Sequence, residues 1–168
     1  MEIGRPAAHA YLLRVVAEFQ GFVRDLHDLA SDKLVEMSGP DVRFQSLLVA
    51  AATEGRRIDR GNADLGSIRY DFMRIGLADL DARIARHNGY WNAGSRRRGD
   101  KAYYGELIEL RNALAHGNQR QLDGLRRRGV RDTVTWARSR LAGVDRFACA
   151  LDRAVWDHLR ETFGTEPW

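Results

Sequence analysis

Residues 134–155 have the sequence VTWARSRLAGVDRFACALDRAV, and the spacing of the apolar residues in this stretch decides the fold class. They recur at alternating intervals of three and four, as on one face of a helix: Val134, Ala137, Leu141, Val144, Ala148, Leu151 and Val155. This stripe predicts a last helix over about residues 132–163 that packs lengthwise against antiparallel neighbours. We therefore expect an all-α fold, an up-and-down antiparallel bundle of about five helices with a long C-terminal helix.

Helical periodicity continues upstream of this stretch, and no segment shows sustained strand alternation. Further helices are predicted at about residues 7–37, 41–60, 67–87 and 101–116, with a short helix or loop over 119–131. The second of these is expected to bury Phe44, Leu47, Leu48, Ala51 and Ile58. Because no repeat or linker interrupts the pattern, we expect a single domain over residues 1–168.

The composition, 44% hydrophobic and 30% charged residues, is typical of a soluble globular protein. The longest clean apolar run, residues 47–52, is too short to cross a bilayer, and Met1–Pro6 does not resemble a signal peptide. We therefore expect a cytoplasmic protein that does not enter a membrane. Cys149 is the only cysteine, which excludes an internal disulfide and a thiolate metal cluster, and its apolar neighbours predict a buried side chain.

The net charge of +4 is carried almost wholly by arginine, since Lys33 and Lys101 are the only lysines. Arginine presents a planar fork that suits phosphate, and it stacks on bases. A polyanionic partner is one interpretation of this composition. The arginine usage of a GC-rich genome is the other.

The segment Arg111-Asn112-Ala113-Leu114-Ala115-His116 contains Arg-x4-His with Asn directly after the Arg. The chain also contains the same spacing at Arg153 and His158, so spacing alone is weak evidence of a site. His158 continues the apolar stripe of the last helix and is expected to be a satisfied core histidine. His116 instead precedes Gly117 at a predicted helix end, where a side chain can project into a cleft, and Asn112 shares its helix face.

This segment resembles the HEPN superfamily, whose ribonuclease members carry Arg-x4-His to Arg-x6-His in a helical bundle. The resemblance implies that Arg111 and His116 are catalytic and that Asn112 orients the arginine or binds phosphate. Glu106 and Glu109 are weaker candidates for positioning the arginine.

The resemblance also implies a metal-independent endoribonuclease with RNA as its substrate and no cofactor. The 2′-hydroxyl of RNA would attack the phosphate and leave a 2′,3′-cyclic phosphate, with a histidine moving a proton and an arginine stabilising the phosphorane. HEPN nucleases dimerise so that two motifs face one cleft, which predicts a homodimer with a composite active site. A toxin–antitoxin, antiviral or stress-response role follows, with an antitoxin or regulator as a possible partner. Toxins of this family often carry Tyr two residues after the His as a modification site, but here that position is Asn118.

Two arginine triplets flank the motif helix in sequence: Arg96, Arg97 and Arg98 before it, and Arg126, Arg127 and Arg128 after it. They are candidates for phosphate contacts along an RNA channel, or they are solvated loop charges. Tyr90 and Trp91, beside the first triplet, either stack on bases or anchor the core.

The other histidines show no metal-ligand spacing, so no metal site is predicted. His27 is expected on the polar flank of the first helix, and His9 and His87 have no partner pattern. Two further hypotheses stay open beside the ribonuclease: a catalytically silent HEPN-like module that binds RNA or a protein, and a plain helical interaction bundle.

Overall fold

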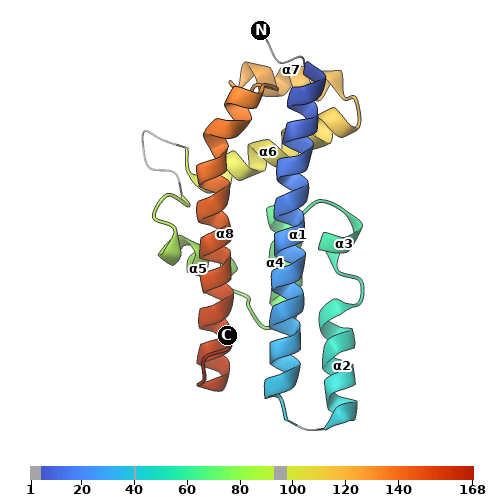
Figure 1. The fold of residues 1–168 in the computed structure, drawn as a ribbon, viewed down its shortest axis with the longest axis vertical. Helices are drawn as coiled ribbons and strands as arrows, with labels where there is room; N and C mark the ends of the chain where they lie inside the picture. Colours follow the sequence, from blue (N-terminus) through green and yellow to red (C-terminus); the bar gives the residue numbers. More distant parts are fainter. Residues whose placement is uncertain (1–4, 40, 93–97) are drawn as a thin grey trace. The chain divides into compact units, whose positions relative to one another are not determined.

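The computed structural model describes residues 5–39, 41–92 and 98–168, which form eight helices and no strand (Figure 1). The helices are α1 (Arg5–Met37), α2 (Val42–Thr53), α3 (Arg57–Arg60), α4 (Leu65–Arg74), α5 (Leu80–His87), α6 (Asp100–Ala115), α7 (Gln119–Arg127) and α8 (Val134–Phe163). The all-α class is confirmed, and so is the long C-terminal helix, because α8 has 30 residues. The expected count of about five helices was too low. Over the described ranges, no helix combines the length and the apolar character needed to cross a membrane.

Two glycines account for two of the three additional helices, and the third is α7, where a short helix or loop was expected. Gly55, with φ of +71°, separates α2 from α3, and Gly76, with φ of +90°, separates α4 from α5. Glycine adopts this left-handed backbone region without the steric cost that other residues meet. Each break is short and the apolar residues resume after it, so periodicity predicted one helix where the chain forms two.

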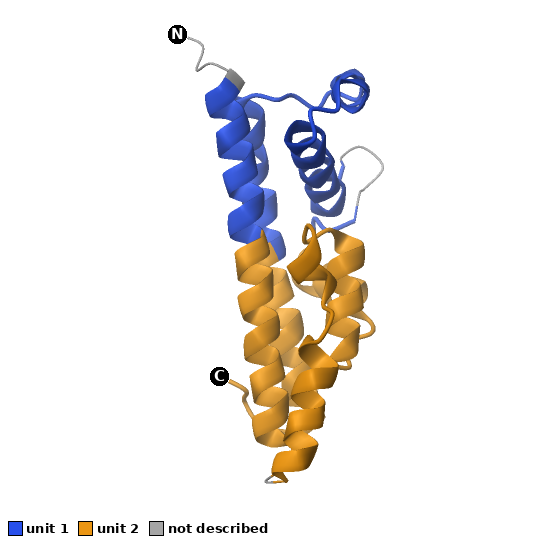
Figure 2. Cartoon of the chain, turned by 90° about the vertical axis from the view of Figure 1, so that its right-hand side faces the viewer, with its two compact units in different colours: residues 1–19, 90–147 blue, residues 20–89, 148–168 orange. Residues whose placement is uncertain are grey.

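The chain divides into two compact units, drawn in different colours in Figure 2. Unit 1 comprises residues 1–19 and 90–147, and unit 2 comprises residues 20–89 and 148–168. Neither unit is a continuous stretch of chain, because α1 and α8 each contribute a segment to both. The single domain over residues 1–168 stays a prediction.

An aromatic cluster forms the centre of unit 1. Phe147 lies with its ring centroid 4.6 Å from that of Trp91 and 5.0 Å from those of Phe19 and Tyr104. Such tilted and edge-on pairs add to the stabilisation that burial of the rings already provides. Trp91 is fully buried and therefore a core anchor, whereas Tyr90 is exposed and lies beneath the guanidinium of Arg146.

The core of unit 2 is mainly aliphatic. Its fully buried apolar side chains come from α1, α3, α4, α5 and α8 and from the turns after α3 and α4, and they include Val23, Ala30, Ile58, Ala63, Ile68, Phe72, Leu77, Ile84, Leu151, Val155 and Leu159. Over the predicted helix at residues 67–87, Leu77, Leu80 and Ile84 are buried, whereas Met73 is exposed.

The predicted stripe of α8 is only partly buried. Ala137, Leu151 and Val155 are buried, but Leu141 is 36% exposed and Phe147, outside the stripe, is fully buried. The three-four spacing identifies an apolar face of α8, but Phe147, which packs in the aromatic cluster of unit 1, is not among the positions that this spacing predicts.

The expected burial of α2 was wrong. Phe44 is 49% and Leu47 69% exposed, Ala51 is also exposed, and Ile58 is buried in α3 rather than in α2. Helix α2 contacts the rest of unit 2 through buried Ala52 and through polar bonds. One such bond runs from the Gln45 side chain to the carbonyl of Gly39 at 2.7 Å. Helical periodicity identifies an apolar face, but it does not say whether the same chain covers that face.

Candidate functional site

The Arg111–His116 segment forms the last turn and the end of α6 in unit 1. Arg111 and Asn112 are both half-buried, and the Arg111 guanidinium donates a hydrogen bond to Asn112 Oδ1 at 3.2 Å. This contact fixes one end of the guanidinium and leaves its other N–H groups able to donate. The structure thus brings two of the three predicted catalytic residues into direct contact.

His116 is the residue at which α6 ends. The N–H of Gly117 donates to the carbonyl of Leu114 at 3.3 Å and the N–H of Asn118 to that of Ala113 at 2.8 Å, while Gly117 has φ of +60°. These two bonds with a left-handed glycine form a Schellman motif. The chain therefore turns away directly after His116, whose exposed imidazole has no hydrogen bond or ion pair to any residue that the structure describes.

Asn118, at the position where HEPN toxins often carry a modified Tyr, caps a helix in this chain. Its side-chain oxygen accepts from the N–H of Gln121 at 3.1 Å and caps the N-terminus of α7. Asparagine is among the residues that suit this position, because its short side chain reaches the free N–H groups of the first turn. One residue thus ends the α6 turn and begins α7.

The two acidic residues considered for positioning Arg111 bind other arginines. Glu106 is buried and forms an ion pair with Arg98, and Glu109 forms one with Arg128. Asn112 is accordingly the residue that the structure places against the Arg111 guanidinium.

The arginine triplets are partly neutralised within the chain. Arg126 lies 3.0 Å from Asp123 and 2.8 Å from Asp132, and Arg98 and Arg128 pair with glutamates. Arg127 donates a 3.4 Å bond to the backbone carbonyl of Asp123 and has no ion pair with a carboxylate among the residues that the structure describes. An RNA phosphate would compete with these carboxylates. Arg96 and Arg97 lie outside the described residues.

The second Arg-x4-His pair occupies the interior of α8 in unit 2. His158 is half-buried, and its Nε2 lies 3.0 Å from the backbone carbonyl of Ile75. The expectation of a satisfied core histidine is therefore confirmed. Arg153 is exposed, because five residues along a helix correspond to about 140° of rotation.

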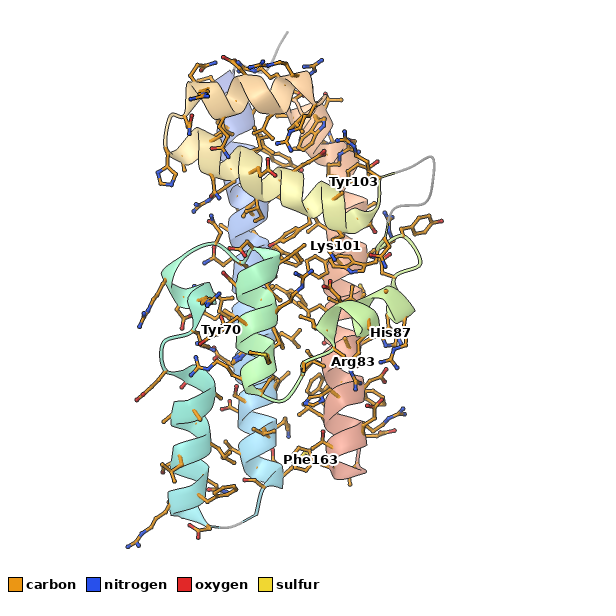
Figure 3. All side chains as sticks on the ribbon, turned by 180° about the vertical axis from the view of Figure 1, so that it is seen from behind. Tyr70, Arg83, His87, Lys101, Tyr103 and Phe163 are labelled. Atoms are coloured by element: carbon orange, nitrogen blue, oxygen red, sulfur yellow. The ribbon has the colours of Figure 1, made fainter. Side chains whose placement is uncertain are left out.

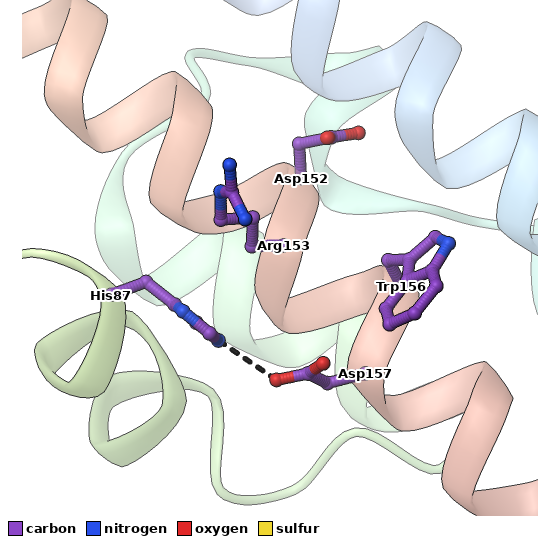
Figure 4. Close-up of a pocket in the computed structure, with 5 residues that line it drawn as sticks. All are labelled: His87, Asp152, Arg153, Trp156 and Asp157. Carbon is purple, nitrogen blue, oxygen red and sulfur yellow. Dashed lines mark hydrogen bonds and ion pairs between the residues drawn. The ribbon is translucent and has the colours of Figure 1, made fainter.

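Arg153 nevertheless lines a pocket that sequence analysis missed (Figure 4). This pocket, of about 270 Å³, lies between α5 and α8 in unit 2, and its lining consists of His87, Asp152, Arg153, Trp156 and Asp157. Figure 3 shows His87 and Arg83 of α5 lying against α8. His87 Nε2 is 2.9 Å from Asp157 Oδ2, and burial raises the pKa of Asp152.

An oriented imidazole, an arginine and an indole in one pocket are chemically competent for proton transfer and anion binding. The signal was absent from the sequence because His87 and Asp157 are 70 residues apart.

A polar cluster around His27 is internal to unit 2. His27 is fully buried, so its expected place on a polar helix flank was wrong. Its Nε2 lies 3.1 Å from the carbonyl of Asp71, and its Nδ1 lies 3.1 Å from the Arg56 guanidinium. Because a carbonyl only accepts and a guanidinium only donates, His27 is the neutral Nε2–H tautomer.

Arg56 also pairs with Asp28 and with Asp59, and the Asp71 carboxylate accepts the backbone N–H groups of Arg57 and Ile58. This network attaches the segment after α2 to α1 and α4.

Two other expectations concern metals and thiols. Cys149 is exposed, so its predicted burial was wrong. Within residues 5–39, 41–92 and 98–168, no group of three or more His, Cys, Asp and Glu side chains is arranged to hold a metal ion.

Comparison of the chain with protein-family models, with curated proteins and with solved structures finds no match.

Proposed function

We propose that the chain is a metal-independent endoribonuclease in which Arg111 and His116 act on RNA. The observation that carries the proposal is the end of α6, where the Schellman turn leaves His116 exposed one turn beyond the Arg111–Asn112 contact. The resemblance to HEPN ribonucleases supports the same residues and an up-and-down bundle around them.

The proposed reaction uses a nucleophile that RNA itself provides. The 2′-hydroxyl oxygen attacks the adjacent phosphorus while an imidazole nitrogen of His116 takes its proton. The new 2′-O–P bond forms as the P–O5′ bond breaks, which leaves a 2′,3′-cyclic phosphate and a 5′-hydroxyl. Arg111, oriented by Asn112, stabilises the charge on the phosphorane oxygens.

The departing 5′-oxygen needs a proton, and one motif supplies one histidine. A second copy of the chain would provide it from its own protonated His116, in a composite site of a homodimer. Cleavage of this kind suits a toxin–antitoxin, antiviral or stress-response role, under the control of an antitoxin or another regulator. The proposed phosphate contacts outside the active site are the arginines of the two triplets, residues 96–98 and 126–128.

The test is incubation of the purified protein with 5′-labelled single-stranded RNA in EDTA. We expect cleavage to a cyclic phosphate and a strong loss of cleavage in Arg111→Ala and in His116→Ala. We expect no cleavage where the nucleotide on the 5′ side of the phosphate lacks its 2′-hydroxyl. Arg138→Ala is the matched control, because Arg138 is an exposed arginine of unit 1 outside the motif. Cleavage that persists in both motif variants would refute the proposal.

The alternative is a catalytically silent HEPN-like module that binds RNA or a protein. The exposed, unpartnered His116 side chain is compatible with it, since no acidic group orients the imidazole within the described chain. RNA binding without any cleavage in the same assay would favour this alternative.

The α5–α8 pocket is a second location for the same chemistry, favoured by the 2.9 Å contact between His87 and Asp157. His87→Ala separates the two locations. Loss of cleavage in His87→Ala but not in His116→Ala would assign the reaction to the pocket, whereas we expect the opposite result.

A further inference from the structure

Helix α2 has the sequence VRFQSLLVAAAT, in which Arg43 is the only charged residue. Despite this composition, Ala52 is the one side chain of α2 that is buried. Val42 is 72% and Leu47 69% exposed, and Phe44 is 49% exposed. Exposed apolar surface of this kind on a soluble protein is characteristic of an interaction site.

Four apolar residues of α2 lie on one side of the helix: Phe44, Leu47 and Ala51, which are exposed, and Leu48, which is half-buried. They are spaced by three, one and three residues, so they form a single stripe along α2. The stripe is symmetric about the midpoint between Leu47 and Leu48, because the intervals are the same in either direction. A helix face with this symmetry is suited to pair with an antiparallel copy of itself.

We propose that α2 is a self-association surface through which two copies of the chain pair antiparallel. A two-fold axis between Leu47 and Leu48 places Phe44 opposite the small Ala51 of the second copy, and Leu47 opposite its Leu48. Large side chains then meet small ones at both ends of the contact, which is how packed helices interdigitate. A contact that uses the same patch on both chains also closes as a dimer.

Charge complementarity supports a second copy of the chain as the binding partner of α2. Arg43 and Glu54 are exposed, and neither has an ion-pair partner in the part of the chain that the structure describes. They lie at opposite ends of α2 and on the same flank of the stripe, by helical spacing. An antiparallel two-fold pair brings equal flanks together, so Arg43 faces Glu54 of the second copy and also the negative end of its helix dipole.

The same features do not fit a lipid surface, since interfacial helices carry several basic residues and α2 has one. The inference does not rest on the proposed function, because sedimentation detects pairing through α2 whether or not the chain cleaves RNA. Helix α2 belongs to unit 2 and the Arg111–His116 segment to unit 1, so a substitution in α2 leaves every residue of that segment unchanged.

The first experiment is sedimentation velocity of the full chain over a concentration series. We expect a species of twice the 19.1 kDa chain mass, and we expect Leu47→Asp to raise the dissociation constant at least about tenfold. Ser46→Asp is the matched control, because it adds the same charge to an exposed position of α2 outside the stripe. Circular dichroism should show both variants folded, since neither side chain is buried.

The second experiment reverses the charges. Arg43→Glu and Glu54→Arg should each weaken the dimer, and the double variant should restore it, which a residue that only stabilises the monomer would not do. A wild-type monomer at all concentrations, equal effects of Leu47→Asp and Ser46→Asp, or a double variant no tighter than the single ones would each overturn the proposal.

Discussion

Two segments with identical spacing, Arg111–His116 in α6 and Arg153–His158 in α8, acquire opposite surroundings. His116 is the last residue of its helix turn and is exposed, next to a half-buried Arg111 that contacts Asn112. His158 is half-buried and contacts the carbonyl of Ile75, while its arginine is exposed and lines a pocket with His87 instead.

The difference follows from position within a helix. In the interior of a helix, residues five apart point about 140° from each other, so one faces the core when the other faces solvent. At a helix end the chain leaves the cylinder, and the last side chain is no longer held to that geometry. Identical Arg-x4-His spacing thus gives an exposed histidine at a helix end and a half-buried one in a helix interior.

The largest expected effect on this comparison concerns RNA cleavage. We predict that His116→Ala lowers the cleavage rate by about 100-fold or more, the usual contribution of a proton-transfer group. His158→Gln keeps a side chain that donates to the Ile75 carbonyl and should retain near wild-type rates. Initial rates on one labelled RNA at a temperature where all proteins are folded provide the measurement. Similar losses in the two variants would remove the functional distinction between the segments.

The next effect concerns the free energy of unfolding, which we expect to depend more on His158 than on His116. His158→Ala should lower the free energy of unfolding by about 1–2 kcal/mol, because the bond to the Ile75 carbonyl and the packing around it are lost. His116→Ala should change it by less than about 0.5 kcal/mol, because the side chain is exposed and makes no bond within the described residues. Urea unfolding of both variants tests this. A larger loss of stability in His116→Ala than in His158→Ala would contradict an exposed His116 side chain.

The end of α6 can be altered without touching the motif. Gly117→Ala should destabilise the protein by about 1 kcal/mol, since Gly117 has φ of +60° and alanine meets a steric cost there. Gly105→Ala, also in the α6 region, should stabilise it by about 0.5–1 kcal/mol, because it is inside the helix and a Cβ meets nothing within 4 Å. Thermal unfolding of the two variants shows whether each melting temperature rises or falls. If both substitutions raised it or both lowered it, the Schellman turn would not be what ends the helix.

The smallest expected effect concerns the pH dependence of stability, and it comes from His27, which lies in neither segment. Burial and the adjacent Arg56 lower the pKa of His27 below its ordinary value of 6.5. The unfolded chain then binds the proton more readily, so this contribution to stability is complete above about pH 6.5 and declines as the pH falls below it.

Urea midpoints at pH 7.5 and 5.5 should therefore differ less in His27→Gln than in the wild type. His116→Ala is the control and should keep the wild-type pH dependence. An unchanged pH dependence in His27→Gln would assign the acid sensitivity to other groups.

Local sequence signals were sufficient for the helical class, for the long last helix and for the exit at Gly117. Each depends on contacts within a few residues, such as the bond from Asn118 to the carbonyl of Ala113. Sequence also distinguished His116 from His158, because a glycine follows one and an apolar stripe continues past the other. The breaks at Gly55 and Gly76 were missed, since one turn of changed backbone does not disturb the apolar periodicity.

The amino-acid sequence was therefore enough to predict the helical class, the long last helix and the helix end at Gly117, because hydrogen bonds and steric limits between near neighbours decide these features. Which apolar and polar faces are covered became known from the folded chain alone. His27 is buried against Arg56, His87 contacts Asp157 across 70 residues, and Phe44, Leu47 and Ala51 of α2 are exposed. Burial depends on which segments, distant in sequence, pack together. A helical pattern identifies which residues share a face, but it does not show which segment packs against that face.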